Sequence, residues 1–301
     1  MNWQAHIKDY KLYLKIERGL SINTIISYVQ DVEKLALYID DYNIQTTALS
    51  ISKETIKEFI YDCSKKISAS SQARLISGLR NFFDYLVFEA YRKTNPTDLL
   101  ESPKLGRKLP DTLSVEEIDK LLASYIENDT LGLNFRNKVL IECMYSCGLR
   151  VSELIQLRKA DLYFEEGFIR VIGKGNKERY VPIYETTQAL ITQYIQKERI
   201  KCISAKTNTD VIFLNRRGKP LSRNMIFIIV KRLAEINGIK KNISPHTFRH
   251  SFASHLLSNG ADLRMIQEML GHESITTTEI YLHLDRKKLS EVINLYHPRK
   301  E

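Results

Sequence analysis

Four short segments of the sequence place side chains of the kinds that can bind a phosphate or attack it. The first is GLRVSEL, at residues 148–154, in which Arg150 stands between apolar residues at a break between two predicted helices. A partly buried arginine is costly unless it meets an anion. Glu153 follows three residues later, so the local pattern predicts either a structural pair between the two side chains or an arginine that binds a substrate anion.

The second segment is GKGNKER, at residues 173–179, which we expect at the tip of a hairpin. Glycines on both sides of Lys174 let the backbone turn tightly and leave the lysine side chain mobile. Glycine-rich nucleotide loops precede helices, whereas this loop joins two predicted strands, and no GxxxxGK[ST] motif occurs. A lysine that swings to a phosphate therefore fits better than a nucleotide site, with a solvated turn as the alternative.

The third segment is SPHTFRH, at residues 244–250, where Pro245 begins a predicted helix. His246 and Arg249 lie three residues apart on one face of its first turn, beside free backbone N–H groups and the positive end of the helix dipole. This is a natural anion site. A metal site with His250 and His255 is the alternative, but the glutamate of HExxH is missing and an arginine stands among the histidines.

The fourth segment runs from residue 270 to residue 283 and contains His272 and Tyr281. Taken alone, the histidine predicts a helix cap and the tyrosine a packed surface residue. Together with the other segments they complete a set of two arginines, a lysine, two histidines and a tyrosine. Two guanidiniums can hold the charge of a phosphodiester transition state, the tyrosine can be a covalent nucleophile, and the lysine or a histidine can protonate the leaving oxygen. The set suits phosphodiester chemistry without a metal or other cofactor.

The charge of the chain is compatible with a polyanionic partner. The 301 residues include 45 Lys+Arg and 36 Asp+Glu, a formal net charge of +9. Residues 1–105 hold 14 basic and 13 acidic residues, which leaves 31 and 23 in the remainder, so a net +8 follows residue 105. Such an excess allows nucleic acid or anionic lipid as the partner.

Several other classes of protein are disfavoured. The first residues alternate charged and apolar types, unlike a signal peptide, and no uncharged stretch approaches the roughly 20 residues of a membrane span. The four cysteines form neither a disulfide framework nor a paired CxxC zinc pattern. Cys143 and Cys147 lie one helical turn apart in an apolar segment, which predicts two buried thiols. We therefore expect a reduced, cytoplasmic protein.

Helical periodicity positions the first part of the chain as a compact four-helix bundle. The first helix is expected over residues 3–17, the second after a cap at Ser21 or Asn23, the third after Ser52, and the fourth after Ser70 or Ser71. Residues 102–110 are rich in proline, glycine and basic residues, which predicts an extended linker. The expected domains are therefore residues 1–101 and 111–301, joined by residues 102–110.

The second part of the chain mixes helices with a small antiparallel sheet, which makes the expected fold mainly α. A capping box at Ser114 and Glu117 opens a helix to about residue 126, and a second helix ends at Gly148. Strands are expected over residues 161–164, 168–172 and 180–182. The further helices are expected at about residues 184–201, 222–237, 246–258, 262–270 and 286–295.

These segments resemble the tyrosine recombinase (phage-integrase) family, and its Xer branch in particular. GLRVSEL, GKGNKERYVPI and HTFRHSFASHLLSNGADLRMIQEMLGHESITTTEIYLHL match that branch in order and spacing. The similarity covers nearly the whole chain, and the long final motif is highly specific, whereas GLRVSEL or GKGNK alone is not. The resemblance implies a SAM-like, four-helix core DNA-binding domain over residues 1–101 and an α+β catalytic domain over residues 111–301.

The resemblance also implies a role for each residue that makes or breaks a bond. Tyr281 is the nucleophile, which forms a 3′-phosphotyrosyl link and frees a 5′-hydroxyl. Lys174 is the general acid for the 5′-oxygen. His246 assists proton transfer at the tyrosine.

Three further residues are implied to bind the scissile phosphate. Arg150 and Arg249 clamp it, and His272 donates a hydrogen bond to it. The departures from the family pattern are mild: Glu273 stands where relatives often have serine, and Phe248 replaces a frequent leucine. Neither removes a chemical role.

The implied function is site-specific recombination of duplex DNA through a Holliday junction. Four protomers act together, as a homotetramer or with a second Xer-type recombinase. The implied task is the resolution of chromosome dimers before division, at the nucleoid and with the septal DNA translocase FtsK. No cofactor and no membrane insertion are implied. The helix at residues 286–295 resembles a tail that packs into a neighbouring protomer, and its stripe Leu289, Val292 and Ile293 fits that role or packing within the chain.

Three alternatives remain open from the sequence. A mobile-element integrase would share the same active site, and the compact length favours the Xer branch over it. A DNA-binding accessory protein without catalysis is disfavoured because all six candidate side chains are present. A metal-dependent nuclease is the third alternative.

Overall fold

The computed structural model describes residues 3–103, 111–124, 133–173, 175, 177–202, 210–271 and 284–298. The chain separates into two compact units, Met1–Lys108 and Leu109–Glu301, which we call the N-terminal and C-terminal units. Most of the expected linker, residues 104–110, lies outside the described residues, and the predicted domain boundaries stay predictions.

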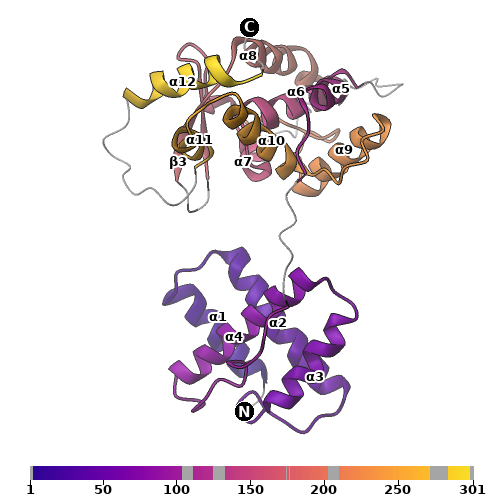
Figure 1. The fold of residues 1–301 in the computed structure, drawn as a ribbon, viewed down its shortest axis with the longest axis vertical. Helices are drawn as coiled ribbons and strands as arrows, with labels where there is room; N and C mark the ends of the chain where they lie inside the picture. Colours follow the sequence, from indigo (N-terminus) through magenta and orange to yellow (C-terminus); the bar gives the residue numbers. More distant parts are fainter. Residues whose placement is uncertain are drawn as a thin grey trace. The chain divides into compact units, whose positions relative to one another are not determined.

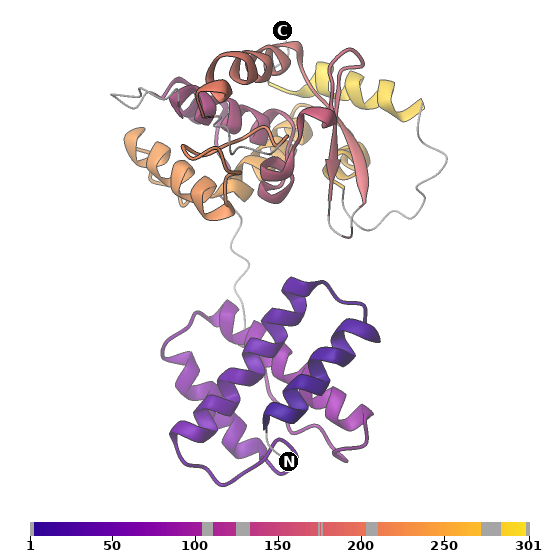
Figure 2. The ribbon, with the colours of Figure 1, turned by 180° about the vertical axis from the view of Figure 1, so that it is seen from behind.

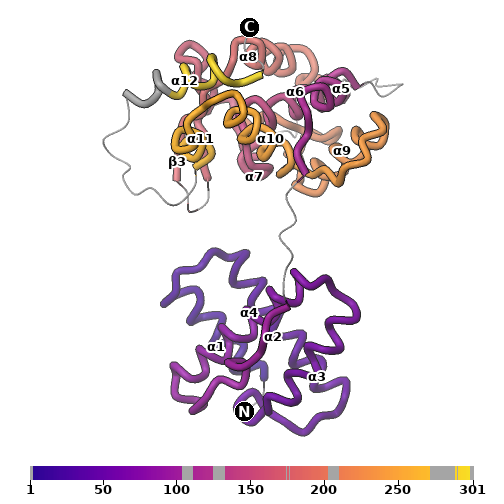
Figure 3. The backbone as a smooth tube through the Cα atoms, in the orientation of Figure 1, coloured from indigo at the N-terminus to yellow at the C-terminus, as the bar shows by residue number. Residues whose placement is uncertain are grey.

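The helices of the N-terminal unit are seen in Figures 1 and 3. They share one aromatic and aliphatic core. Tyr10 and Leu14 of the first helix are fully buried, and the Tyr10 ring meets the Phe82 ring edge-on at 5.1 Å between centroids. The helices are α1 (Trp3–Ile16), α2 (Ile22–Asp41), α3 (Lys53–Ser64) and α4 (Ala69–Phe88).

Serine caps begin three of these helices. Ser21 and Ser52 cap α2 and α3 as predicted, each accepting a hydrogen bond from a backbone N–H three residues later. The prediction for α4 is wrong, because Ser68 is the cap rather than Ser70 or Ser71. Ser68 accepts from the Ser71 N–H at 3.3 Å, so the first serine of the run is the one whose hydroxyl reaches the free donors of the first turn.

One ion pair, between a buried aspartate and a half-exposed arginine, joins α2 to α4. Both Asp31 oxygens accept hydrogen bonds from Arg74 at 2.7 Å, and the Asp31 carboxylate is fully buried. Gly78 leaves the space that this carboxylate occupies, since a Cβ there would lie 2.4 Å from Asp31 Oδ2. The arginine, the aspartate and the glycine therefore form one packing unit.

The C-terminal unit combines helices with a three-stranded antiparallel sheet of order β1-β2-β3. Val171 is paired with Arg179 across β2 and β3. The strands are β1 (Leu162–Tyr163), β2 (Phe168–Ile172) and β3 (Glu178–Pro182). The helices are α5 (Val115–Ala123), α6 (Leu133–Ser146), α7 (Val151–Gln156), α8 (Glu185–Gln193), α9 (Arg223–Ile236), α10 (Pro245–Ser258), α11 (Leu263–Leu270) and α12 (Leu284–Tyr296).

Two helices of this unit differ from their predicted extents. Helix α5 ends at Ala123 rather than near residue 126, where Ser124 turns extended and accepts a hydrogen bond from Asn237. The helix expected over residues 184–201 is α-helical only to residue 193 and continues as a π-helical and then a 3₁₀ turn. Arg199 in that last turn is buried and donates to the Val211 carbonyl, so a tertiary contact sets the local winding.

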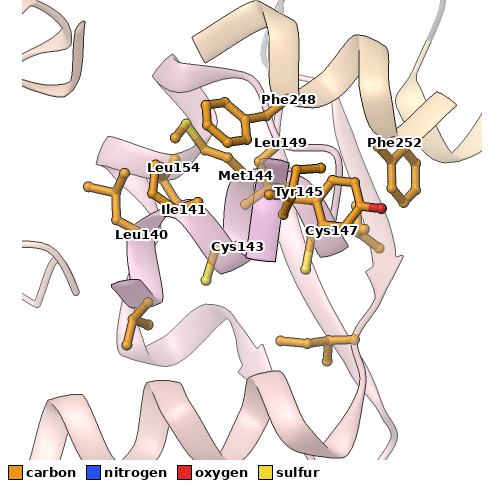
Figure 4. Packing of buried hydrophobic residues seen from close by; sticks show 14 of the residues in the cluster. Leu140, Ile141, Cys143, Met144, Tyr145, Cys147, Leu149, Leu154, Phe248 and Phe252 are labelled. Carbon is orange, nitrogen blue, oxygen red and sulfur yellow. The ribbon is translucent and has the colours of Figure 1, made fainter. Parts of the chain in front are cut away.

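Helix α6 is buried on all sides from Val139 to Ser146, and Figure 4 shows its apolar side chains packed in the core of the C-terminal unit. Its side chains pack against Phe248 and Phe252 of α10. Cys143 and Cys147 are free, buried thiols, which confirms the sequence prediction. Burial raises the pKa of both, that of Cys147 to about 12, so neither is a ready nucleophile at neutral pH.

The last helix, α12, packs against its own unit beside β3 and α10 (Figure 2). Leu289 and Ile293 are buried there, and Val292 is partly buried against the same core. The Tyr184 hydroxyl donates to the Ile293 carbonyl. Contact of this helix with a neighbouring protomer stays a prediction. Among the described helices, none is long and apolar enough to cross a membrane.

Candidate active site

A glycine turn between α6 and α7 creates the first wall of the site. Gly148 has φ +58°, a conformation that favours glycine, and it ends the helix before it. A Cβ at this position would lie 2.7 Å from the Phe252 ring and 3.0 Å from Leu270. The backbone therefore approaches two buried side chains at a distance that excludes any larger residue without rearrangement.

Arg150 begins α7 in an extended conformation, and its side chain is held at both ends of the guanidinium. Nη1 donates to Glu153 Oε1 at 2.9 Å, and Nη2 donates to the Gly271 carbonyl at 3.0 Å. Its backbone N–H also donates to Glu153 Oε2 at 2.8 Å. The side chain remains 29% exposed. Arg150 thus combines a structural pair with an accessible guanidinium, and the two sequence interpretations are compatible.

Arg249 lies on α10 and is 8% exposed. Its Nη1 donates to the Gly148 carbonyl at 2.7 Å and its Nη2 to the Leu270 carbonyl. No ion pair involves Arg249 among the residues that the structure describes. Burial lowers the pKa of Arg249 to about 9, with a further contribution from the nearby charges of Arg150 and Arg179. The guanidinium is therefore still cationic at neutral pH.

The histidines of α10 divide into exposed and half-buried positions. His246 is exposed in the first turn, directly after Pro245, and His250 is also exposed. His255 shares a hydrogen bond of 2.8 Å with the Tyr145 hydroxyl, and burial lowers the pKa of this histidine. The described residues include no group of three His, Cys, Asp or Glu side chains placed to hold a metal ion.

Arg179 is the member of this site that the sequence prediction missed. It lies on β3, is 14% exposed, and donates to both Glu153 oxygens at 2.7 and 2.8 Å. Glu153 is 1% exposed and so holds two arginines with one carboxylate. Burial alone would raise the pKa of Glu153, but the hydrogen bonds and charge of Arg179, with those of Arg150, outweigh it and lower that pKa.

The end of α11 provides a hydrogen-bond acceptor for each arginine. The consecutive carbonyls of Met269, Leu270 and Gly271 accept from Arg179, Arg249 and Arg150, respectively. Carbonyls at a helix C-terminus lack intrahelical partners and carry the negative end of the helix dipole, which favours cations there. Three guanidiniums from three different elements are thereby gathered around one helix end and one carboxylate.

The described structure brings together part of the predicted site. Arg150 and Arg249 lie on the same helix end, and His246 stands in the first turn of the helix that carries Arg249. The other three candidates, Lys174, His272 and Tyr281, lie outside the described residues. With three guanidiniums and one carboxylate, the described cluster carries a surplus of positive charge and suits an anionic ligand such as a phosphate.

Comparison with known proteins agrees with this chemistry. The phage integrase family model matches residues 111–288, and the model of the phage integrase N-terminal SAM-like domain matches residues 7–90. The chain belongs to the phage integrase family. The resemblance predicted from the sequence is thus confirmed, as is the mainly helical fold with its SAM-like N-terminal domain.

Relatives of this phage integrase family member are similar over nearly their whole length. Tyrosine recombinase XerD of Oceanobacillus iheyensis is 43% identical over 296 residues, 97% of this chain and 98% of that protein. Tyrosine recombinase XerD of Listeria innocua is 40% identical over 294 residues, with the same coverage of each chain. Such full-length similarity makes the chain an enzyme of the same kind, a site-specific DNA tyrosine recombinase.

Solved structures show the same fold. A post-cleavage complex of the XerH site-specific recombinase bound to its palindromic difH substrate matches with a TM-score of 0.70 and 27% identity, over 92% of this chain and 81% of that chain. A lambda integrase tetramer bound to a Holliday junction matches with a TM-score of 0.70 over 93% of this chain and 80% of that chain. At 17% identity, the latter likeness concerns the fold alone.

Proposed function

We propose that this recombinase is of the Xer type and cuts and rejoins duplex DNA through a 3′-phosphotyrosyl intermediate and a Holliday junction. The observation that carries the proposal is the arginine cluster. Arg249 is fixed by neutral carbonyls, and one carboxylate, Glu153, faces both Arg150 and Arg179, so a surplus of positive charge is held in place. A scissile phosphate would balance this surplus positive charge. Its attraction to the arginines increases in the transition state, as negative charge builds on its nonbridging oxygens.

The proposed reaction has two mirrored steps. The Tyr281 oxygen attacks the phosphorus, the bond to the 5′-oxygen breaks, and Lys174 gives that oxygen its proton while His246 assists removal of the tyrosine proton. The phosphate in transit is held by Arg150 and Arg249, with His272 as a further donor. The 5′-hydroxyl of the partner strand then attacks the phosphotyrosyl bond and releases the tyrosine. Because one ester replaces another in each step, the reaction needs no ATP.

The proposed biological task is the resolution of chromosome dimers at cell division. Full-length similarity to XerD proteins supports this task. We propose that four protomers act on two DNA sites, either as identical copies or together with a second Xer-type recombinase, and that the septal translocase FtsK is a partner at the nucleoid. Sequencing the junctions formed in cells would separate this task from integration of a mobile element, whose junctions would join an element to its target.

Covalent trapping tests the chemistry. A nicked suicide substrate loses its 5′-hydroxyl fragment after cleavage, so the wild-type chain should accumulate as a DNA adduct. Tyr281→Phe should form none, whereas Tyr296→Phe, a matched change on α12, should form adduct at the wild-type rate. Full adduct formation by Tyr281→Phe would overturn the assignment of the nucleophile. Loss of cleavage in excess chelator would overturn the metal-free mechanism.

A further inference from the structure

Arg179 has no assigned role in the reaction, although its guanidinium makes three hydrogen bonds in the site, against two each for Arg150 and Arg249. We propose that Arg179 is a positioning residue for DNA cleavage: it acts through Glu153 and the end of α11 to hold Arg150 available for the scissile phosphate. The inference rests on the proposed function. It concerns how the Arg150 guanidinium is oriented and how Arg179 limits its pairing with Glu153.

The donors of Arg179 are directed at protein atoms. Nη1 and Nη2 bind the two Glu153 oxygens, and Nε donates to the Met269 carbonyl at 2.9 Å. With 14% of its side chain exposed, this guanidinium is oriented into the fold. Arg150 differs, since it is twice as exposed at 29% and holds Glu153 by one side-chain hydrogen bond. The two arginines therefore have different roles. Arg179 neutralises the Glu153 carboxylate, and Arg150 keeps part of its guanidinium exposed.

Removing Arg179 would change what Arg150 must do. Glu153 is 1% exposed, and a buried carboxylate that loses a bidentate partner is strongly destabilised or draws its remaining partner closer. Arg150 would then be the principal counter-ion of Glu153. The Glu153 carboxylate would then neutralise the charge of Arg150. The Arg150 guanidinium would also move away from the Gly271 carbonyl, to which it now donates at 3.0 Å.

The same residue ties together the segments that carry other predicted catalytic side chains. Arg179 follows the turn that contains Lys174, and the base of that turn is closed by the Gly173 N–H donating to the Lys177 carbonyl at 2.8 Å. Its Cδ would lie 3.1 Å from a Cβ at Gly271, the residue that directly precedes His272. One guanidinium thus links β3, α7 and the end of α11.

The sheet provides a matched control. Arg170 on β2 pairs with Asp161, donating Nε at 3.0 Å and Nη2 at 2.7 Å, so it is also an arginine held by a mostly buried carboxylate. It contacts none of the arginines of the site in the hydrogen bonds described above. Arg170→Met therefore measures what loss of a structural arginine–carboxylate pair does to this unit.

The experiment measures the rate of covalent adduct formation on a nicked suicide substrate under single-turnover conditions, with DNA affinity measured separately. Arg179→Met should slow cleavage by about 100-fold, the scale expected when a mutation displaces a reacting group by about 1 Å, while DNA affinity changes less than threefold. Arg179→Lys, which keeps the charge but loses the two-pronged geometry, should recover part of the rate. Arg170→Met should cleave within threefold of wild type.

A double mutant tests whether Arg179 acts through Glu153. If it does, the double variant Glu153→Gln/Arg179→Met should cleave faster than the product of the two single losses predicts, since Glu153→Gln already removes the carboxylate and leaves Arg179 mainly its contact with the Met269 carbonyl to lose. Multiplicative losses would overturn the inference, as would an Arg179→Met rate equal to that of Arg170→Met. If the wild-type chain forms no adduct, the proposed function fails instead, so the two failures are distinguishable.

Discussion

Replacement of Gly148 by alanine tests how tightly the site is packed around the turn that begins it. Two costs add at this position. The left-handed conformation at φ +58° costs about 1 kcal/mol for a residue with a Cβ. The new Cβ would also meet Phe252 at 2.7 Å and Leu270 at 3.0 Å, and overpacking a filled core costs about 1–3 kcal/mol.

We therefore expect Gly148→Ala to lower the free energy of unfolding of the C-terminal unit by about 3 kcal/mol. Gly167→Ala is the matched control, because Gly167 has φ +74° and nothing within 4 Å of its Cβ position. That variant should lose only the conformational share, about 1 kcal/mol. The difference between the two variants isolates the contact with the two buried side chains.

Urea denaturation followed by circular dichroism measures both variants. The single tryptophan, Trp3, belongs to the core of the N-terminal unit, so its fluorescence follows that unit in the same samples and should not change. A loss in Gly148→Ala within about 0.5 kcal/mol of the loss in Gly167→Ala would refute the packing argument, since that is the precision with which such values add. It would mean that the Phe252 and Leu270 side chains can move aside without lowering the free energy of unfolding.

Three further predictions concern the charges. Arg74→Leu leaves the fully buried Asp31 without its described partner and should destabilise the N-terminal unit by about 3–5 kcal/mol, measured by Trp3 fluorescence, whereas Arg74→Leu/Asp31→Asn should recover much of that loss. Glu153 has a pKa below its unfolded value, so its contribution to stability is present above about pH 4.3 and lost as pH falls further. Glu153→Gln should accordingly lower stability at pH 7 and flatten the acid limb of the stability–pH curve; an unchanged limb would contradict the assignment. Finally, DNA affinity should fall steeply with salt, and most of that slope should disappear when residues 106–301 are deleted, because the net +8 lies there; a slope retained by residues 1–105 would contradict this.

Local signals were sufficient for most of the fold. Apolar periodicity and serine caps predicted the four helices of the N-terminal unit, with an error in the cap of α4, where three serines lie within the four residues 68–71. The strand β3 begins at Glu178, two residues earlier than predicted, because its first two residues are charged and carry no apolar signal. These two residues belong to the strand because they pair with Ile172 and Val171 of β2, which their side-chain types do not indicate.

The side-chain contacts within the site were predictable from residue patterns only where the partners are local in sequence. Glu153 lies three residues from Arg150, so helical spacing indicated that pair. Arg179 lies 26 residues from Glu153, and their contact depends on the register of a strand and the end of a distant helix. No pattern within either segment predicts such a contact. The tertiary fold decides it.

Arg249 has a consequence for the speed with which the site can respond to an anion. A surface arginine must shed ordered water and give up rotamer freedom when it binds a ligand. Arg249 did both when the protein folded, since it is buried and its donors rest on the carbonyls of Gly148 and Leu270. Dipoles hold it without neutralising it. The site therefore meets its ligand with little reorganisation left to perform, and the entropic cost of ordering this guanidinium falls on folding rather than on each catalytic cycle.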